Sequence, residues 1–62
     1  MTDSQWDAVY AVYAEVSKAR DSRTLTKERF DPLLKRAEEI VGEEGWALEG
    51  LYMTASQLEG DV

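Results

Sequence analysis

The sequence predicts an all-α fold, a small three-helix bundle with helices at about residues 4–20, 26–41 and 44–58. Apolar residues recur at spacings of three and four, which is the period of a helix, and no segment alternates between apolar and polar residues as a half-buried strand does. A polar connector at residues 20–24 and a glycine at position 42 separate the periodic segments. Three amphipathic helices without strands pack most simply as a bundle, so we expect residues 1–62 to form a single domain.

The first predicted helix begins at Asp3 or Ser4, whose side-chain oxygens can cap the first free backbone N–H groups. Its apolar residues spread over an arc of about 200°, roughly twice the usual apolar stripe, so the helix must contact more than one neighbour. They include an aromatic edge made of Trp6, Tyr10 and Tyr13. We expect this edge to pack in the core with its phenol groups reaching water. Stacking on nucleic-acid bases is the alternative, and the acidic neighbours of the edge disfavour it.

The second predicted helix has the clearest pattern. Thr26 is a typical N-cap, and Pro32 offers a competing start because proline is tolerated in a first turn. We expect one helix from Thr26 to Val41, with a kink at Pro32 left open. Its apolar face follows the helical period over Phe30, Leu33, Leu34, Ala37, Ile40 and Val41.

The third predicted helix follows Gly42, which is placed to end the helix before it. Glu43 and Glu44 suit the positive N-terminal end of a helix, and we expect the helix to run from Glu44 to Leu58. Two glycines, Gly45 and Gly50, lower its helix propensity. The predicted apolar face consists of Ala47, Leu48, Leu51, Tyr52, Ala55 and Leu58.

Charge is distributed unevenly along the chain, which has a net charge of −6. Residues 18–36 hold all seven Lys and Arg residues and three acids, a net charge of +4, whereas residues 37–62 hold seven acids and no Lys or Arg. An acidic surface repels nucleic acid and anionic membranes and attracts basic surfaces. The pattern favours a protein partner with a basic surface, on which the acids could mimic a nucleic-acid backbone. The alternative is that the charge only keeps the chain soluble.

Several kinds of chemistry have no residues to carry them. The chain has no His and no Cys, so the usual general base, thiolate nucleophile and zinc ligands are missing. We find no glycine-rich phosphate loop and predict no catalytic residue, cofactor or metal site. No apolar run is long enough for a membrane span, and the N-terminal residues lack a signal-peptide pattern, so we expect a cytoplasmic, non-enzymatic protein.

One surface of the third helix is a candidate binding site. Helical geometry places Trp46 and Met53 well away from the apolar face, beside Gly50, where a second backbone could approach closely. We therefore predict that a partner contacts Trp46, Glu49, Gly50, Met53, Gln57, Glu43 and Glu44. In the alternative interpretation, Trp46 folds inward at the start of the helix and Met53 fills a gap in the core.

These observations lead to an expected function as a small acidic protein-binding module that inhibits, regulates or helps to assemble a larger protein. Its small size and charge are typical of proteins encoded by phages or plasmids. Two alternatives stay open. The chain could be a structural homodimer with no external target, since a domain of 62 residues has a thin margin of stability. It could also be a small DNA-binding regulator that uses the basic segment 18–36, although the lack of cations in the third helix makes nucleic acid an unfavoured partner.

Overall fold

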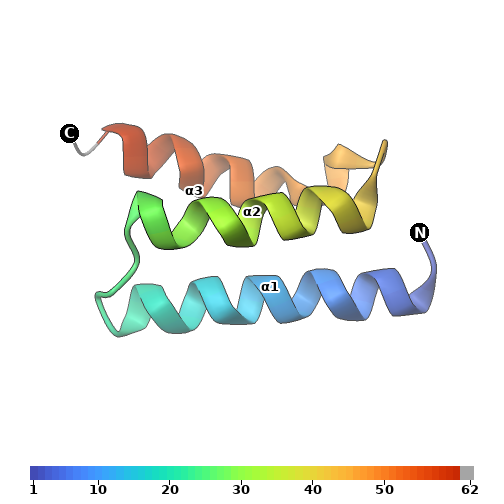
Figure 1. The fold of residues 1–62 in the computed structure, drawn as a ribbon, viewed down its shortest axis with the longest axis horizontal. Coiled ribbons are helices and arrows are strands. Elements are labelled where there is room, and N and C mark those ends of the chain that lie inside the picture. The colour runs from blue at the N-terminus through green and yellow to red at the C-terminus, as the bar shows by residue number, and fades with distance from the viewer. Residues whose placement is uncertain (61–62) are drawn as a thin grey trace.

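The computed structural model describes residues 1–60, which form three α-helices joined by short connections (Figure 1). In chain order these are α1 (Asp3–Asp21), α2 (Lys27–Val41) and α3 (Glu49–Gly60), with a 3₁₀ turn, Gly45–Leu48, directly before α3. Helices α1 and α3 run in the same direction and α2 runs in the opposite one (Figure 1). None of residues 1–60 lies in a strand. The predicted all-α fold with three helices is confirmed.

Helix α1 begins at Asp3, one of the two predicted starts, but its N-cap is Thr2 and neither Asp3 nor Ser4. The Thr2 hydroxyl accepts from the backbone N–H of Gln5, and the Gln5 side chain accepts from the backbone N–H of Thr2 at 2.7 Å. This reciprocal pair satisfies two donors that a helix end leaves free. The Gln5 amide also donates to the carbonyl oxygen of Ile40 at 3.0 Å, so the same residue joins the start of α1 to the end of α2.

Helix α2 begins where the sequence predicts, with Thr26 as its N-cap. The Thr26 hydroxyl accepts from the backbone N–H of Arg29 at 3.2 Å. Pro32 lies inside the helix, which runs through it as one element from Lys27 to Val41. The competing start at Pro32 is therefore wrong, because the cap at Thr26 has already begun the helix one turn earlier.

Replacing Thr26 with alanine is expected to lower the free energy of unfolding by about 1 kcal/mol, because the first turn of α2 loses its cap. Thr24→Ala is the matched control, since the Thr24 hydroxyl makes one long, exposed bond to the carbonyl oxygen of Ala19 at 3.4 Å and accepts from no N-terminal turn. Chemical denaturation of both variants measures the difference. An equal loss in the two variants would contradict the capping role of Thr26.

The predicted start of the third helix at Glu44 is wrong by five residues. Gly42 ends α2 with a φ of 58°, and Glu44 is also outside helical geometry, with φ −92° and ψ 47°. The chain then makes the 3₁₀ turn Gly45–Leu48, and α-helical geometry begins only at Glu49. Glycine at position 45, a weak helix former, agrees with this tighter turn. The change matters because Trp46 lies in the 3₁₀ turn.

The core draws on all three helices. Three valines of α1, three residues of α2 and two leucines of the α3 region form one buried cluster: Val9, Val12, Val16, Phe30, Ala37, Val41, Leu48 and Leu51. Leu33, Leu34, Ile40, Ala47, Ala55 and Leu58 are half-buried against it. These residues belong to the apolar faces predicted from the sequence. Tyr52 was predicted to share the face of α3 and is instead 41% exposed.

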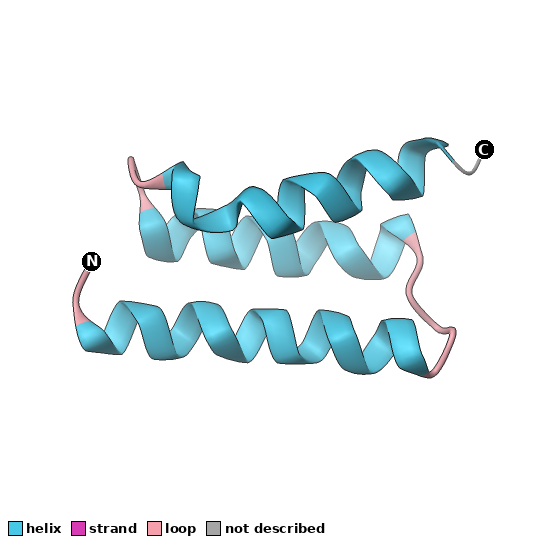
Figure 2. Cartoon of the chain, turned by 180° about the vertical axis from the view of Figure 1, so that it is seen from behind, coloured by secondary structure: helices cyan, strands magenta, loops and turns pink. Residues whose placement is uncertain are grey.

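Helix α2 packs against α1 and against α3 with its preceding 3₁₀ turn. Within residues 1–60, few residues of α1 lie close to α3. Seen from behind, α1 and α3 stand in front with α2 behind and between them (Figure 2). Side chains bridge α1 and α3 at three levels, and these contacts build the surface described next.

Candidate protein-binding surface

Trp46 and Met53 are both on the surface. Trp46 is 67% exposed and Met53 is 60% exposed. The alternative in which Trp46 folds into the core and Met53 fills a gap is therefore wrong. The physical reason is that Leu48 and Leu51 already occupy the inward positions of this segment, both almost fully buried. A Trp and a Met that remain in water need another explanation than core packing.

Trp46 does not stand alone, because the aromatic edge of α1 lies beside it. The ring centroids of Trp6 and Trp46 are 5.9 Å apart in an edge-to-face arrangement, and those of Trp6 and Tyr10 are 5.8 Å apart and stacked. Trp6 is half-buried, and Tyr10 is 60% exposed. The prediction that this edge packs in the core is therefore wrong for Tyr10. Two features that are forty residues apart in the sequence form one aromatic cluster.

A side chain at Gly50 would crowd a neighbour within the same molecule. A Cβ atom at Gly50 would come within 3.1 Å of the Tyr13 ring, and the Tyr13 hydroxyl donates to the carbonyl oxygen of Ala47 at 3.1 Å. The space that the sequence suggested for a second backbone is therefore taken by Tyr13. Because this ring fills the gap between α1 and α3, the two helices present one joined surface at this level.

Replacing Tyr13 with phenylalanine is expected to lower the free energy of unfolding by about 1 kcal/mol, because the hydrogen bond to Ala47 is lost while the ring stays. Tyr10→Phe is the matched control, since Tyr10 is largely exposed on the same helix. Denaturant unfolding of the two variants makes the comparison. If Tyr13→Phe were no more destabilising than Tyr10→Phe, the bridge would contribute nothing to the fold.

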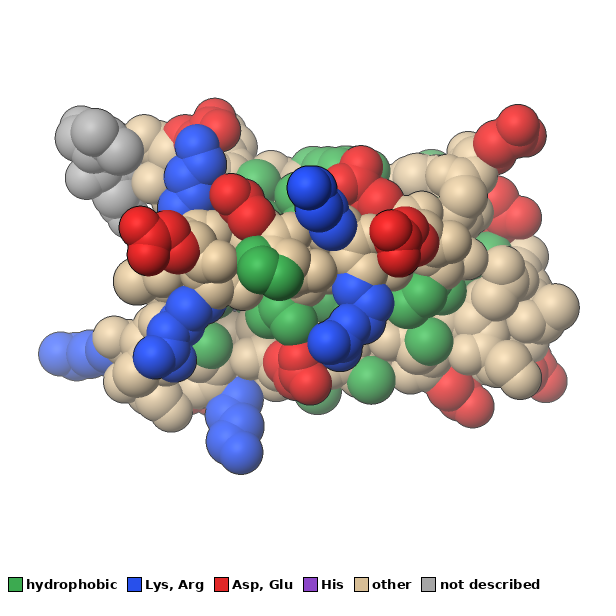
Figure 3. Space-filling view, viewed as in Figure 1, with side chains coloured by type: hydrophobic (Ala, Val, Ile, Leu, Met, Phe, Trp, Pro, Cys, Tyr) green, Lys and Arg blue, Asp and Glu red, His purple; other side chains and the backbone are tan. Residues whose placement is uncertain are grey.

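We call this surface the α1/α3 face. Its residues come from one side of α1 and from the 3₁₀ turn and adjoining side of α3: Trp6, Tyr10, Tyr13, Ser17, Trp46, Gly50, Met53 and Gln57. None of them is charged. The opposite side of the molecule differs: Lys, Arg, Asp and Glu side chains cover much of it, with only small apolar areas between them (Figure 3).

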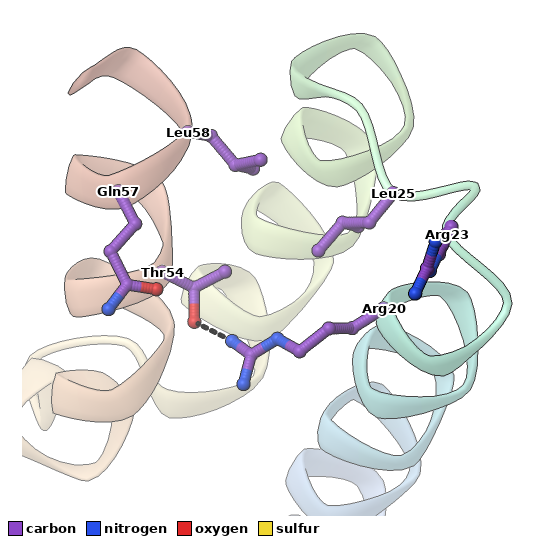
Figure 4. Close-up of a pocket in the computed structure, with 6 residues that line it drawn as sticks. All are labelled: Arg20, Arg23, Leu25, Thr54, Gln57 and Leu58. Atoms are coloured by element: carbon purple, nitrogen blue, oxygen red, sulfur yellow. Dashed lines mark hydrogen bonds between the residues drawn. The ribbon is translucent and has the colours of Figure 1, made fainter. Parts of the chain in front are cut away.

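A pocket of about 220 Å³ lies at the far end of the α1/α3 face, near the connection between α1 and α2. Arg20 crosses from α1 to donate to the Thr54 hydroxyl at 3.0 Å, and this hydroxyl donates in turn to the carbonyl oxygen of Gly50 at 3.0 Å (Figure 4). Arg23 is nearby, with a left-handed backbone at φ 57°. The remaining lining residues are Leu25, Gln57 and Leu58. The pocket lining therefore combines two arginines with two leucines and the polar side chains of Thr54 and Gln57.

The acids predicted to frame the binding site have different roles in the structure. Glu43 and Glu49 are exposed. Glu44 is half-buried, and its carboxylate contacts the amino group of Met1 at 3.2 Å. Of the three predicted acids, Glu44 is thus the one that forms an ion pair within residues 1–60. Gln57 is exposed at the rim of the pocket.

The hydrogen bond between Arg20 and Thr54 was not among the contacts predicted from the sequence. Thr54 is 7% exposed, although a threonine in a helix is usually placed on a polar surface. Its position three residues after Leu51 puts it next to the buried face, which is the one signal that could have identified it. We predicted that Arg20 belongs to a solvated connector. In the structure Arg20 lies in the last turn of α1, and its side chain reaches Thr54 of α3.

Within residues 1–60, no helix is both long enough and apolar enough to cross a membrane. In the same residues no three acidic side chains lie close enough together to hold a metal ion. No protein-family model matches the chain, and comparison with curated proteins and with solved structures found no significant match.

Proposed function

We propose that the chain is a non-enzymatic protein-binding module that docks another protein on its α1/α3 face. The observation that carries the proposal is the exposure of Trp46, Tyr10 and Met53. Trp46 and Tyr10 both lie against the ring of Trp6, and Met53 lies about one turn after Gly50, which Tyr13 covers. Trp, Tyr and Met are enriched in the cores of protein interfaces, and charged residues are depleted there. A surface that joins these three side chains without a charge among them has that composition.

The shape of the face suits a helix or a pair of helices. Trp6 and Trp46 stand at one end, Tyr13 covers the space above Gly50 in the middle, and the pocket beside Thr54 lies at the other end. The large exposed side chains at one end can insert into a partner, and the pocket at the other end can accept a side chain from it. Well-packed aromatic anchors of this kind carry most of the binding energy in measured interfaces.

The nucleic-acid alternative receives less support from the fold. Base readout or phosphate contact by the basic connector would need its cations to be free to reach out. Arg20 is held by Thr54, and Lys27 contacts Glu59 with 3.6 Å between Nζ and Oε1. The nearest aromatic cluster lies toward the opposite, acidic end of α1, away from these cations. We therefore place protein binding first.

Site-specific photo-crosslinking inside cells tests the proposal. A photoreactive amino acid replaces Met53 in one variant and Lys35, which is exposed on the outer side of α2, in another. We expect covalent adducts from position 53 and few or none from position 35. The result that would remove the proposal is equal crosslinking at both positions, or none at either while the variants remain folded.

A further inference from the structure

We infer that the protein docked on the α1/α3 face is a second copy of this chain, placed antiparallel, so that the aromatic end of each copy covers the arginine end of the other. This inference rests on the proposed function and names its partner. It follows from the order of residues along each helix. Residues at matching distances before and after Tyr13 in α1, and before and after Gly50 in α3, are complementary in size or charge.

The face of α1 is complementary to itself when its direction is reversed. Trp6 lies two turns before Tyr13 and Arg20 lies two turns after it, each about 10 Å away along the axis. A two-fold axis that crosses α1 at Tyr13 therefore brings Trp6 of one copy to Arg20 of the other. An arginine over an indole ring is a favourable contact, which strengthens when water is excluded. The hydrogen bond from Arg20 to Thr54 lies in the plane of the guanidinium group and leaves its flat face available for this ring.

The residues one turn from the axis also match in size. Tyr10 and Ser17 lie about one turn on either side of Tyr13. In the antiparallel arrangement the exposed ring of Tyr10 meets the small Ser17 of the second copy. A parallel arrangement would place Tyr10 against Tyr10 and leave a gap at Ser17, so the size pattern favours the antiparallel one.

The side of α3 repeats this register. Trp46 and Met53 lie at similar distances on either side of Gly50, which shares its level with Tyr13. The same axis brings Trp46 of one copy against Met53 of the other, an aromatic ring against a thioether, which is a favourable pair. Gly50 and the Tyr13 ring that covers it lie near the axis.

Charge at the two ends of the face agrees with the same arrangement. Asp3 lies in the first turn of α1, and Arg23 lies two residues after Asp21, the last residue of this helix, so the two charges mark opposite ends of α1. Antiparallel pairing therefore sets Asp3 of each copy against Arg23 of the other, twice in the dimer. In a parallel dimer each end would face its own charge. Isologous two-fold dimers are the commonest oligomers, and such a dimer would also cover the exposed apolar side of a domain too small to have much stability of its own.

Sedimentation of the purified chain from micromolar to millimolar concentration measures the association. We expect a reversible shift from the 7.0 kDa monomer to a species of twice that mass. Arg23→Asp should weaken the dimer about tenfold or more, because two carboxylates then face each other at each end of the interface. Asp3→Arg should do the same, and the double variant carrying both changes should recover most of the loss. Lys35→Asp, the same charge reversal on the outer side of α2, should have a much smaller effect.

Engineered cysteines test the direction of pairing, because the chain has no cysteine of its own. Tyr10→Cys and Ser17→Cys are made as separate variants, and both positions are exposed. An antiparallel dimer predicts a disulfide-linked pair when the two variants are mixed and oxidised, and little linkage within either variant alone. Linkage within each variant alone, without the mixed pair, would overturn the antiparallel arrangement.

Failure of this inference can be told apart from failure of the proposed function. A chain that stays monomeric at millimolar concentration, yet still gives adducts from position 53 in cells with a mass other than that of two copies, would overturn the inference and leave the docking surface in place. A dimer whose stability responds equally to Arg23→Asp and Lys35→Asp would overturn the inference as well. Loss of the adducts at position 53 in folded protein would overturn both.

Discussion

Replacing Phe30 with alanine is expected to leave most of the chain unfolded. Phe30 is 1% exposed and is the largest side chain in the core. Truncating a buried phenylalanine costs about 3–5 kcal/mol, and the single core of a domain this small supplies about 3–5 kcal/mol in total. The loss is therefore of the same size as the whole stability.

Circular dichroism with thermal and denaturant unfolding measures this effect. Tyr52→Ala is the matched control, because it removes an aromatic ring that is 41% exposed and should cost much less. A Phe30→Ala chain that unfolds with the same midpoint as the unmodified chain would mean that the core is not where the three helices place it.

Met53→Asp is expected to leave the fold intact and to abolish association on the α1/α3 face. Met53 is largely exposed in the single chain, so an aspartate there should change the free energy of unfolding by no more than about 0.5 kcal/mol. In a covered face the same carboxylate would be buried without a partner. We expect at least a hundredfold weaker association, which corresponds to about 2.7 kcal/mol.

Two measurements on the same variant separate these effects. Denaturant unfolding at low concentration reports the single chain, and sedimentation or crosslinking from Tyr10 reports association. Lys35→Asp places the same side chain on the outer surface of α2 and should change neither. If the Met53→Asp variant associated as strongly as the unmodified chain, this part of the α1/α3 face would not be covered by a partner.

The three helices could be predicted because their signals are local. Thr26 caps the helix that follows it, and the residues from Phe30 to Val41 keep one helical period, so neither depends on a distant part of the chain. The start of α3 could not be predicted in the same way. The acids Glu43 and Glu44 suit a helix start, yet Gly42 and Gly45 let the chain turn first and delay α3 to Glu49.

The candidate site was predictable in part. Helical spacing alone separated Trp46 and Met53 from the apolar face, and both are exposed. The contact of Trp46 with Trp6 could not be predicted, because periodicity indicates which side of a helix is apolar and not which helix lies next to it. The broad apolar arc of α1 suggested several neighbours inside the molecule. Instead, the part that carries Tyr10 is in water, and Tyr13 uses its hydroxyl to reach Ala47.

The interpretation of charge changed most between sequence and structure. The acidic segment after residue 37 suggested a carboxylate-lined binding site, but Glu44 is taken up by the amino group of Met1. The face that joins the exposed aromatic residues has no charge among its members and is flanked by Asp3 at one end and Arg23 at the other. Electrostatics would then set the direction in which a partner docks, while the aromatic residues supply the contact area.

Backbone amide NMR of the purified chain over a concentration series tests most directly whether a second copy covers the α1/α3 face. We expect the resonances of residues 6, 10, 17, 50 and 53 to shift as concentration rises, while those of the outer side of α2, such as residues 28, 35 and 39, stay in place. Shifts that cluster on the outer side of α2, or no shifts at any residue up to millimolar concentration, would contradict it.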